Sequence, residues 1–317
     1  MGGALDPAVA TARNAIRDNL ADLAPGSRVV VAVSGGVDSL ALAAATAFVA
    51  VKAGLSLSAV VVDHDLQSGS SAVAEEARGK LESLGIPAMV VAVEVGSDGG
   101  MEAAARQARY AVLDRLDAEA VLLGHTLDDQ AETVLLGLGR GSGSRSIAGM
   151  AAVDGSYRRP FLALTRQDTE QVCRASGLEW WSDPHNADPS YTRSRLRHEV
   201  LPLLEDVLGG GVAAALARTA DFLRADNAVL DEAAGAHTGV LEVDKLRELP
   251  AAIRTRVLRH AALAAGADPS ELAAHHIRGI DRLITDWHGQ QRIELPGGVA
   301  ARRTGDALHF GPTSVAG

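Results

Sequence analysis

The chain has 317 residues, of which 47% are hydrophobic and 22% are charged, with a net charge of −10. These values are ordinary for a globular protein, and the length allows a sizeable core and two domains. No apolar run reaches the ~18 residues that cross a bilayer, and the N-terminus lacks the pattern of a signal peptide. We therefore expect a cytoplasmic protein with no membrane partner.

The single cysteine, Cys173, excludes an intramolecular disulfide, a Cys-rich zinc site and a two-cysteine sulfur relay within this chain. The negative net charge ordinarily argues against a nucleic-acid partner, because phosphate binding depends on Lys and Arg. Most basic side chains are arginines, which suit forked phosphate contacts. The arginine excess also fits a general compositional bias, so it is weak support for a nucleic-acid partner.

Strands and helices are expected to alternate through the first 140 residues. The N-terminal helix follows Asp6-Pro7, and apolar runs predict four strands. The strands are expected at 29–33, 57–62, 88–93 and 121–124, and helices at 39–52, 72–84, around 106–110 and from Asp128 onward. This alternation predicts an α/β fold with a doubly wound parallel sheet, whose strand order the sequence leaves open.

A glycine turn, Ser34-Gly35-Gly36-Val37-Asp38-Ser39, joins the first of these strands to an alanine-rich helix. Glycines allow close approach of a ligand to the backbone, and amides at a helix start form an anion site. A tight turn with helix-capping residues is the alternative. The segment matches the SGGxDS pyrophosphate loop and so resembles the N-type ATP pyrophosphatase (PP-loop) superfamily. No Lys follows the last glycine, so it is not a Walker A loop.

Polar residues follow two other strands at their carboxyl ends, where open α/β sheets bind ligands. Asp63 and His64 follow the second strand, and His125 follows the fourth. An acidic helix start comes next, in which Asp128, Asp129 and Glu132 share helix faces. Thr126 with Asp129 also fits a capping pattern, which would need no site. Their position after His125 favours a site.

Two arginine-bearing segments follow. Arg140-Gly-Ser142-Gly143 is rich in small residues and by itself is typical of a surface loop. The run Arg193-Ser194-Arg195-Leu-Arg197 concentrates positive charge. On a helix, Arg193 and Arg197 share a face while Arg195 points elsewhere. Between these segments, Trp180 and Trp181 are expected to be core anchors.

The last third of the chain is predicted to be mainly helical. Gly209-Gly-Gly211 reads as a hinge, followed by a long helix at 212–234. Further helices are expected at 246–263 and 271–286, and two short strands within 292–303 and 307–310. We therefore predict a PP-loop catalytic domain at 1–208 and a smaller, mainly helical, substrate-binding domain at 209–317.

Taken together, these motifs and Arg159-Pro160 occur in the order seen in tRNA(Ile)-lysidine synthetases, which this chain resembles over most of residues 25 to 205. The resemblance implies ATP-dependent ligation of lysine to C2 of the wobble cytidine in a tRNA(Ile) with anticodon CAU. ATP and Mg²⁺ would be the cofactors, with an adenylated cytidine as intermediate. The oligomeric state stays open, with a homodimer as one alternative.

The same resemblance implies roles for individual residues. Asp38 would be catalytic and hold the metal, with Arg109 and Arg195 stabilising adenylation. ATP would be bound by Ser34, Gly35, Gly36, Val37, Asp38, Ser39, Asp63, His64 and His125. Lysine would contact Asp128, Asp129 and Glu132, and tRNA would contact Arg140, Ser142, Arg159, Arg193 and Arg197.

One departure concerns the basic run, where the family commonly has Arg-Asn and this chain has Arg193-Ser194. It leaves open which arginine acts in catalysis. Rival functions are tRNA thiolation, which the lone Cys173 opposes, and amide formation, which does not account for the basic run. A non-catalytic nucleotide-binding module would lack an appended domain.

Overall fold

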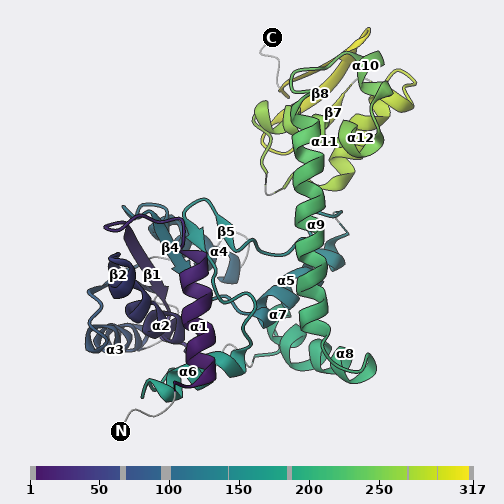
Figure 1. Cartoon of the computed structure of the whole chain (residues 1–317). Coiled ribbons are helices and arrows are strands. Elements are labelled where there is room, and N and C mark those ends of the chain that lie inside the picture. The colour runs from purple at the N-terminus through teal and green to yellow at the C-terminus, as the bar shows by residue number, and fades with distance from the viewer. Residues whose placement is uncertain are drawn as a thin grey trace. The chain divides into compact units, whose positions relative to one another are not determined.

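The computed structural model describes residues 5–64, 69–93, 101–141, 143–183, 188–269, 271–290 and 292–313, with the backbone alone for 101–103. The chain folds into two compact units (Figure 1). Unit 1 comprises Met1–Leu135 and Gly149–Arg218, and unit 2 comprises Leu136–Ala148 and Thr219–Gly317. A short segment from the middle of the chain thus packs with the C-terminal residues. The predicted boundary at 208/209 stays a prediction.

Unit 1 is built on a six-stranded sheet in the order β3-β2-β1-β4-β6-β5. All neighbouring strands are parallel except β5 and β6, so the predicted parallel α/β sheet is confirmed. The strands are β1 (Arg28–Val33), β2 (Ser56–Asp63), β3 (Ala88–Ala92), β4 (Ala120–Leu123), β5 (Val153–Asp154) and β6 (Tyr157–Arg158). The last two were not predicted, because two-residue strands leave no alternating pattern in the sequence.

Helices cover both faces of this sheet. The larger core lies on one face, where Val29, Val31 and Val33 of β1 pack with four helices: α1 (Pro7–Asn19), α2 (Val37–Ala53), α3 (Ser70–Ser83) and α6 (Arg166–Ala175). On the other face, Val30 packs with Leu113 of α4 (Met101–Leu113). Burial on both faces explains why β1 is a continuous apolar run.

The chain leaves β1 toward β2 on one side, whereas β4 pairs with β1 on the other. A ligand crevice forms at such a switch in an open α/β sheet, outside the carboxyl ends of the strands. Ser34 follows β1 there, and Gly124 follows β4. The remaining elements of unit 1 are α5 (Leu127–Arg140), α7 (Thr192–Arg195), a π-helical turn (Leu196–Val200) and α8 (Leu201–Val207), although the end of α5 belongs to unit 2.

Unit 2 is mainly helical, as predicted, with a small antiparallel sheet. Its helices are most of α9 (Val212–Gly235), then α10 (Val243–Glu248), α11 (Ala251–Ala264) and α12 (Ala274–Thr285). Its strands are β7 (Ile293–Leu295), β8 (Val299–Thr304) and β9 (Ala307–Pro312). The expectation of two strands here was wrong. Gly297 and Gly298, both with positive φ, turn the chain between β7 and β8 and divide the first predicted strand in two.

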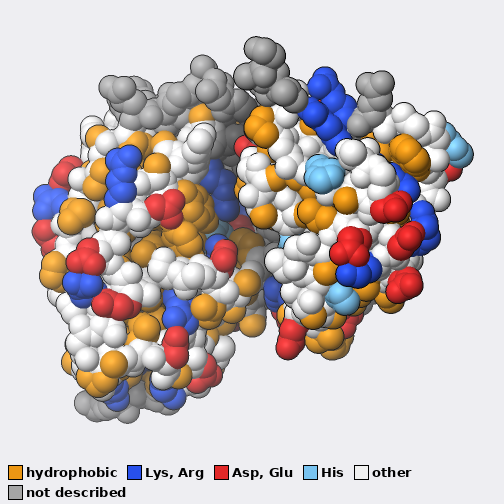
Figure 2. All heavy atoms as spheres, turned by 90° about the horizontal axis from the view of Figure 1, so that it is seen from above, with side chains coloured by type: hydrophobic (Ala, Val, Ile, Leu, Met, Phe, Trp, Pro, Cys, Tyr) orange, Lys and Arg blue, Asp and Glu red, His pale blue; other side chains and the backbone are white. Residues whose placement is uncertain are grey.

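Within the described residues, no single helix is long and apolar enough to cross a membrane. One pair of helical segments is long and apolar enough only when the two are taken together, and the chain bends by 94° between them; the segments are Thr192–Val207 and Val212–Gly235. On the face seen in Figure 2, Lys and Arg side chains are intermixed with Asp and Glu side chains. The net charge of −10 is therefore not gathered into one acidic patch on that face.

Candidate active site

The Ser34–Ser39 loop forms the turn between β1 and α2. Gly35 has φ +83°, a conformation that other residues rarely adopt, and Gly36 is the extended N-cap residue of α2. The Ser39 hydroxyl donates to the Gly36 carbonyl at 2.9 Å and accepts from the Ser34 amide at 3.2 Å. The turn is thus held by its own side chains, while the first-turn amides of α2 form the positive end of a 17-residue helix.

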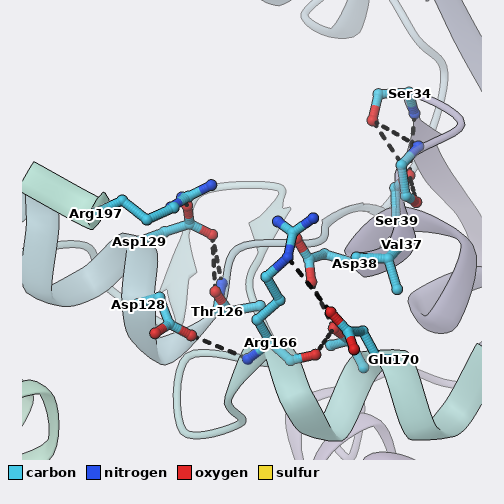
Figure 3. Close-up of polar contacts among 12 residues, drawn as sticks. Ser34, Val37, Asp38, Ser39, Thr126, Asp128, Asp129, Arg166, Glu170 and Arg197 are labelled. Carbon is cyan, nitrogen blue, oxygen red and sulfur yellow. Dashed lines mark hydrogen bonds and ion pairs between the residues drawn. The ribbon is translucent and has the colours of Figure 1, made fainter. Parts of the chain in front are cut away.

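Asp38, in the first turn of α2, contacts two residues of α6. The Thr169 hydroxyl donates to Asp38 Oδ1 at 2.6 Å, and Arg166 Nη1 lies 3.6 Å from Oδ2 (Figure 3). Burial raises the pKa of Asp38, while the Thr169 hydrogen bond and the Arg166 charge oppose that rise. Asp38 therefore has partners that favour its ionised form inside a largely dry environment.

Both α6 residues were missed in the sequence. Thr169 is 131 positions from Asp38, and the start of α6 carries a capping box formed by Thr165 and Asp168. That box accounts for the local sequence pattern by itself. No local signal in the sequence indicates that the same helix reaches Asp38.

The end of β4 comes very close to the loop. A Cβ atom on Gly124 would lie 3.0 Å from both Asp38 C and Ser39 N, so glycine permits this approach. The next residue, His125, is half-buried, and burial lowers its pKa to about 3. His125 is therefore neutral at physiological pH. A neutral imidazole offers one nitrogen as a hydrogen-bond acceptor and one N–H as a donor.

Asp63 is the last residue of β2, which lies beside β1 in the sheet, and His64 follows it. Asp63 is buried, and His64 is half-buried. Burial, followed by the charge of Arg109, lowers the pKa of His64. In the described part of the chain, Nδ1 of His64 and of His125 is buried without a hydrogen-bond partner. The described residues therefore leave one buried nitrogen of each imidazole unsatisfied.

The first two acids of α5 both have capping contacts. Asp129 Oδ2 accepts from the Thr126 amide at 2.8 Å and from its hydroxyl at 3.0 Å, which is the capping arrangement considered from the sequence. Asp128 Oδ2 instead accepts from the backbone N of Arg166 at 3.0 Å (Figure 3). Asp128 thus fixes the start of α6 against α5.

Glu132 and Arg197 form the most buried ion pair of the site. Arg197 Nε donates to Glu132 Oε1 at 2.7 Å, and its Nη2 donates to Asp129 Oδ1 at 3.0 Å. The Glu132 side chain is 0% exposed, and its Oε2 lies 3.6 Å from Arg193 Nη1. Burial raises the pKa of Glu132, and the charge of Arg197 opposes this. We name Asp129, Glu132, Arg193 and Arg197 the acid–arginine cluster.

Arg195 does not join this cluster. Its side chain is 59% exposed and pairs with Glu199 one turn along, at 2.9 Å. The helical spacing of the basic run therefore separates the three arginines as expected, with Arg193 and Arg197 at the acids and Arg195 in solvent. Arg109, on α4, is half-buried, and burial lowers its pKa.

The other predicted tRNA contacts lie in different surroundings. Arg159 is 6% exposed, and its Nη1 donates to the Ala151 carbonyl at 2.9 Å. Arg140 is exposed at the end of α5, in the segment that belongs to unit 2. Ser142 lies outside the described residues. Of the two described arginines, Arg140 is exposed and Arg159 is buried.

A magnesium ion was expected at Asp38. The described residues contain no group of three or more His, Cys, Asp or Glu side chains placed to hold a metal. Mg²⁺ is commonly bound by one or two carboxylates together with substrate phosphates, and it keeps several waters. A single carboxylate beside an anion site fits that mode of binding.

Comparison with known proteins identifies the family. Residues 8–204 match the PP-loop domain model, and residues 241–309 match the TilS substrate binding domain model. A tRNA(Ile)-lysidine synthase from Thermobifida fusca is 53% identical over 309 residues, which cover 94% of this chain and 95% of that protein. The chain belongs to the tRNA(Ile)-lysidine synthase family. Its class is that of an ATP-dependent ligase, as the resemblance implied.

Other tRNA(Ile)-lysidine synthases are similar to this chain over most of its length. The Streptomyces coelicolor protein is 57% identical, covering 88% of this chain and 84% of its own length, and a Mycobacterium tuberculosis protein is 52% identical over 86% and 84%. Among solved structures, the U34-tRNA thiolase NcsA from Methanococcus maripaludis has a TM-score of 0.58 at 17% identity, covering 68% of this chain and 79% of that chain. That similarity shows the PP-loop fold alone.

Proposed function

We propose that this chain ligates lysine to the wobble cytidine of a tRNA(Ile) with anticodon CAU, in the cytoplasm, where ATP, lysine and tRNA meet. Cytosine O2 would attack the α-phosphate of ATP, and the bond to the leaving pyrophosphate would break. The ε-amine of lysine would then attack C2, and AMP would leave with O2 as the C–N bond forms.

One observation supports a two-step site above all others. Arg166 Nη1 lies 3.6 Å from Asp38 Oδ2, and the Arg166 amide donates to Asp128 Oδ2 at 3.0 Å, so the loop and the acidic start of α5 lie against the same residue of α6. An adenylating loop and a group of acids for an amine are the two parts that the reaction needs.

We assign the ATP to the loop and its neighbours. The amides of the Ser34–Ser39 turn and the N-terminus of α2 would bind the pyrophosphate, with Asp63, His64 and His125 along the same edge. Asp38 would hold Mg²⁺, which when bound offsets negative charge on the phosphates. Arg109 and an arginine of the basic run would stabilise the charge that develops at the α-phosphate.

We assign the lysine to the acids of α5, and Glu132 is the preferred one. Asp128 and Asp129 each have an oxygen engaged in capping, whereas the Glu132 carboxylate contacts Arg193 and Arg197. A carboxylate with a raised pKa also accepts a proton from an ammonium more readily.

We assign tRNA contacts to Arg140, Ser142, Arg159, Arg193 and Arg197. The exposed position favours Arg140 over the buried Arg159. For catalysis, the geometry supports Arg193 or Arg197 over Arg195, because only the first two lie at the acids. A homodimer stays one alternative for the assembly.

The test is tRNA-dependent incorporation of labelled lysine, together with ATP–pyrophosphate exchange. We expect both activities in the unmodified chain. Asp38→Asn is expected to abolish exchange and to leave tRNA binding within about twofold. Exchange without lysine incorporation would refute the lysidine assignment while sparing the adenylating one, and turnover by Asp38→Asn would refute the role of the loop.

A further inference from the structure

Arg166 has no part in the steps above, although its guanidinium lies beside the carboxylate at the centre of the loop. It is the first residue of α6, and its side chain is 36% exposed. Its Nη1 lies 3.6 Å from Asp38 Oδ2, and its Nε lies 3.9 Å from Glu170 Oε1. Figure 3 shows Asp38, Arg166 and Glu170 turned toward one another.

The backbone of Arg166 is fixed while its side chain keeps donor capacity. The amide is held by the Asp128 carboxylate at 3.0 Å, so the start of α6 is set independently of the guanidinium. Both side-chain separations exceed hydrogen-bonding distance, and these two carboxylates therefore do not saturate the five N–H donors. A planar fork of such donors matches the geometry of a phosphate.

The charge of Asp38 opposes anion binding at the loop, and Arg166 would offset it alongside the Mg²⁺ proposed above. A carboxylate at the first turn of α2 repels a polyphosphate that approaches the loop amides, and Asp38 is only 21% exposed, so water screens it poorly. Arg166 lies on the side of Asp38 that faces α6 and opposes this repulsion. Its partial exposure leaves the guanidinium open to a ligand.

We propose that Arg166 binds the phosphate chain of ATP, adding a forked side-chain contact to the amides of the Ser34–Ser39 loop. This inference rests on the proposed function of the loop as an ATP site. It makes Arg166 a residue that touches the nucleotide, rather than one that acts only by orienting Asp38.

The experiment is a calorimetric titration with ATP and separately with adenosine, in the absence of tRNA and lysine. Arg166→Ala is expected to weaken ATP binding about 10- to 100-fold, which is the range for hydrogen bonds between charged groups, and to leave adenosine binding unchanged. Arg166→Lys should recover part of the loss, because a lysine keeps the charge without the fork. The variant should fold, because Asp128 bonds to the backbone of residue 166.

Arg174→Ala is the matched control. Arg174 lies on the same helix and pairs with the same Glu170, at 2.8 Å, but its side chain is 56% exposed, and its other contact is with the ring of Trp180 rather than with the loop. It is expected to bind ATP like the unmodified chain.

A double variant, Arg166→Ala with Asp38→Asn, tells whether Arg166 touches the phosphates of ATP or acts only by orienting Asp38. ATP is titrated to millimolar concentrations, so that weak binding is still measured. If Arg166 touches phosphate, Arg166→Ala weakens binding in both backgrounds. The inference is overturned if Arg166→Ala binds ATP as tightly as the unmodified chain, if its effect disappears beside Asp38→Asn, or if adenosine binding falls equally. Failure of the unmodified chain to bind ATP would instead refute the proposed function.

Discussion

Replacing Arg197 by Met is expected to destabilise unit 1 strongly, because it strands a buried carboxylate. Arg197 donates to Glu132 Oε1 at 2.7 Å and to Asp129 Oδ1 at 3.0 Å, and the Glu132 side chain is 0% exposed. Removing one partner of a buried pair costs about 3–5 kcal/mol. Because Arg197 itself is 24% exposed and Arg193 remains near Glu132, we expect the lower end, about 3 kcal/mol. For a unit of this size that is roughly 6–12 °C in apparent melting temperature.

The loss should depend on pH. Burial already raises the pKa of Glu132 above its unfolded value, and removing Arg197 raises the folded-state pKa of this carboxyl further. A folded state that binds the proton more tightly loses stability as pH rises above the unfolded pKa, about 4.3 for Glu. The deficit of the variant relative to the unmodified chain should therefore be small near pH 5 and reach its full size near pH 8.

Thermal unfolding followed by circular dichroism at pH 5 and pH 8 measures this difference. Glu132→Gln in the Arg197→Met background should restore much of the stability, because the amide carries no charge. Arg195→Met is the matched control, since its exposed pair with Glu199 should leave the melting temperature unchanged. A deficit of equal size at both pH values would show that lost packing, rather than a stranded charge, is responsible.

Two further predictions concern the loop and α6. Gly124→Ala should weaken ATP binding at least tenfold and cost about 1–3 kcal/mol of stability, because its Cβ would press on the backbone of Asp38 and Ser39. Gly79→Ala, at an open position of α3, is the control and should change neither quantity. Calorimetry and thermal unfolding measure the two effects, and unchanged ATP binding in Gly124→Ala would contradict the close approach. Asp128→Ala should cost about 1 kcal/mol of stability by removing the acceptor of the Arg166 amide, and it should lower ATP–pyrophosphate exchange. If this variant keeps normal exchange and instead needs much more lysine for incorporation into tRNA, Asp128 binds the amine.

The sheet and the loop were predictable because their signals are local. Val29–Val33 is an apolar run long enough for a strand buried on both faces, and the two glycines after it mark the turn into α2. Gly54 likewise ends α2 in the left-handed conformation expected after a helix. Each of these features depends on residues within a few positions of one another, so the sequence alone indicates them.

The partners of Asp38 were not predictable, because they depend on how α6 packs against α2. Thr169 is buried and reaches Asp38 across 131 positions of sequence. Which face of α6 meets Asp38 is set by tertiary packing, and no residue near Asp38 in the sequence indicates it. The same limit applies to Asp128, whose hydrogen bond to the Arg166 amide joins two helix starts.

The course of the Arg140–Gly143 region could not be inferred either. The residues just after it pack within unit 2, where Ser144 donates to Asn227 at 2.8 Å and Arg145 pairs with Asp231. Arg256 contacts the same Asp231 at 3.0 Å. A run of small residues gives no sign of such distant polar partners, so its surface-loop interpretation was the natural one.

The acid–arginine cluster joins stability and function in the same contacts. In the proposed function Glu132 would receive the lysine ammonium, yet its carboxylate is fully buried and engaged by Arg197. An ammonium can reach that carboxylate only if Arg197 gives up part of this contact, and phosphate charge nearby would favour such a movement of the guanidinium. The ion pair that stabilises unit 1 therefore also closes the acid to solvent, and a substitution that frees Glu132 for its substrate is expected to cost stability.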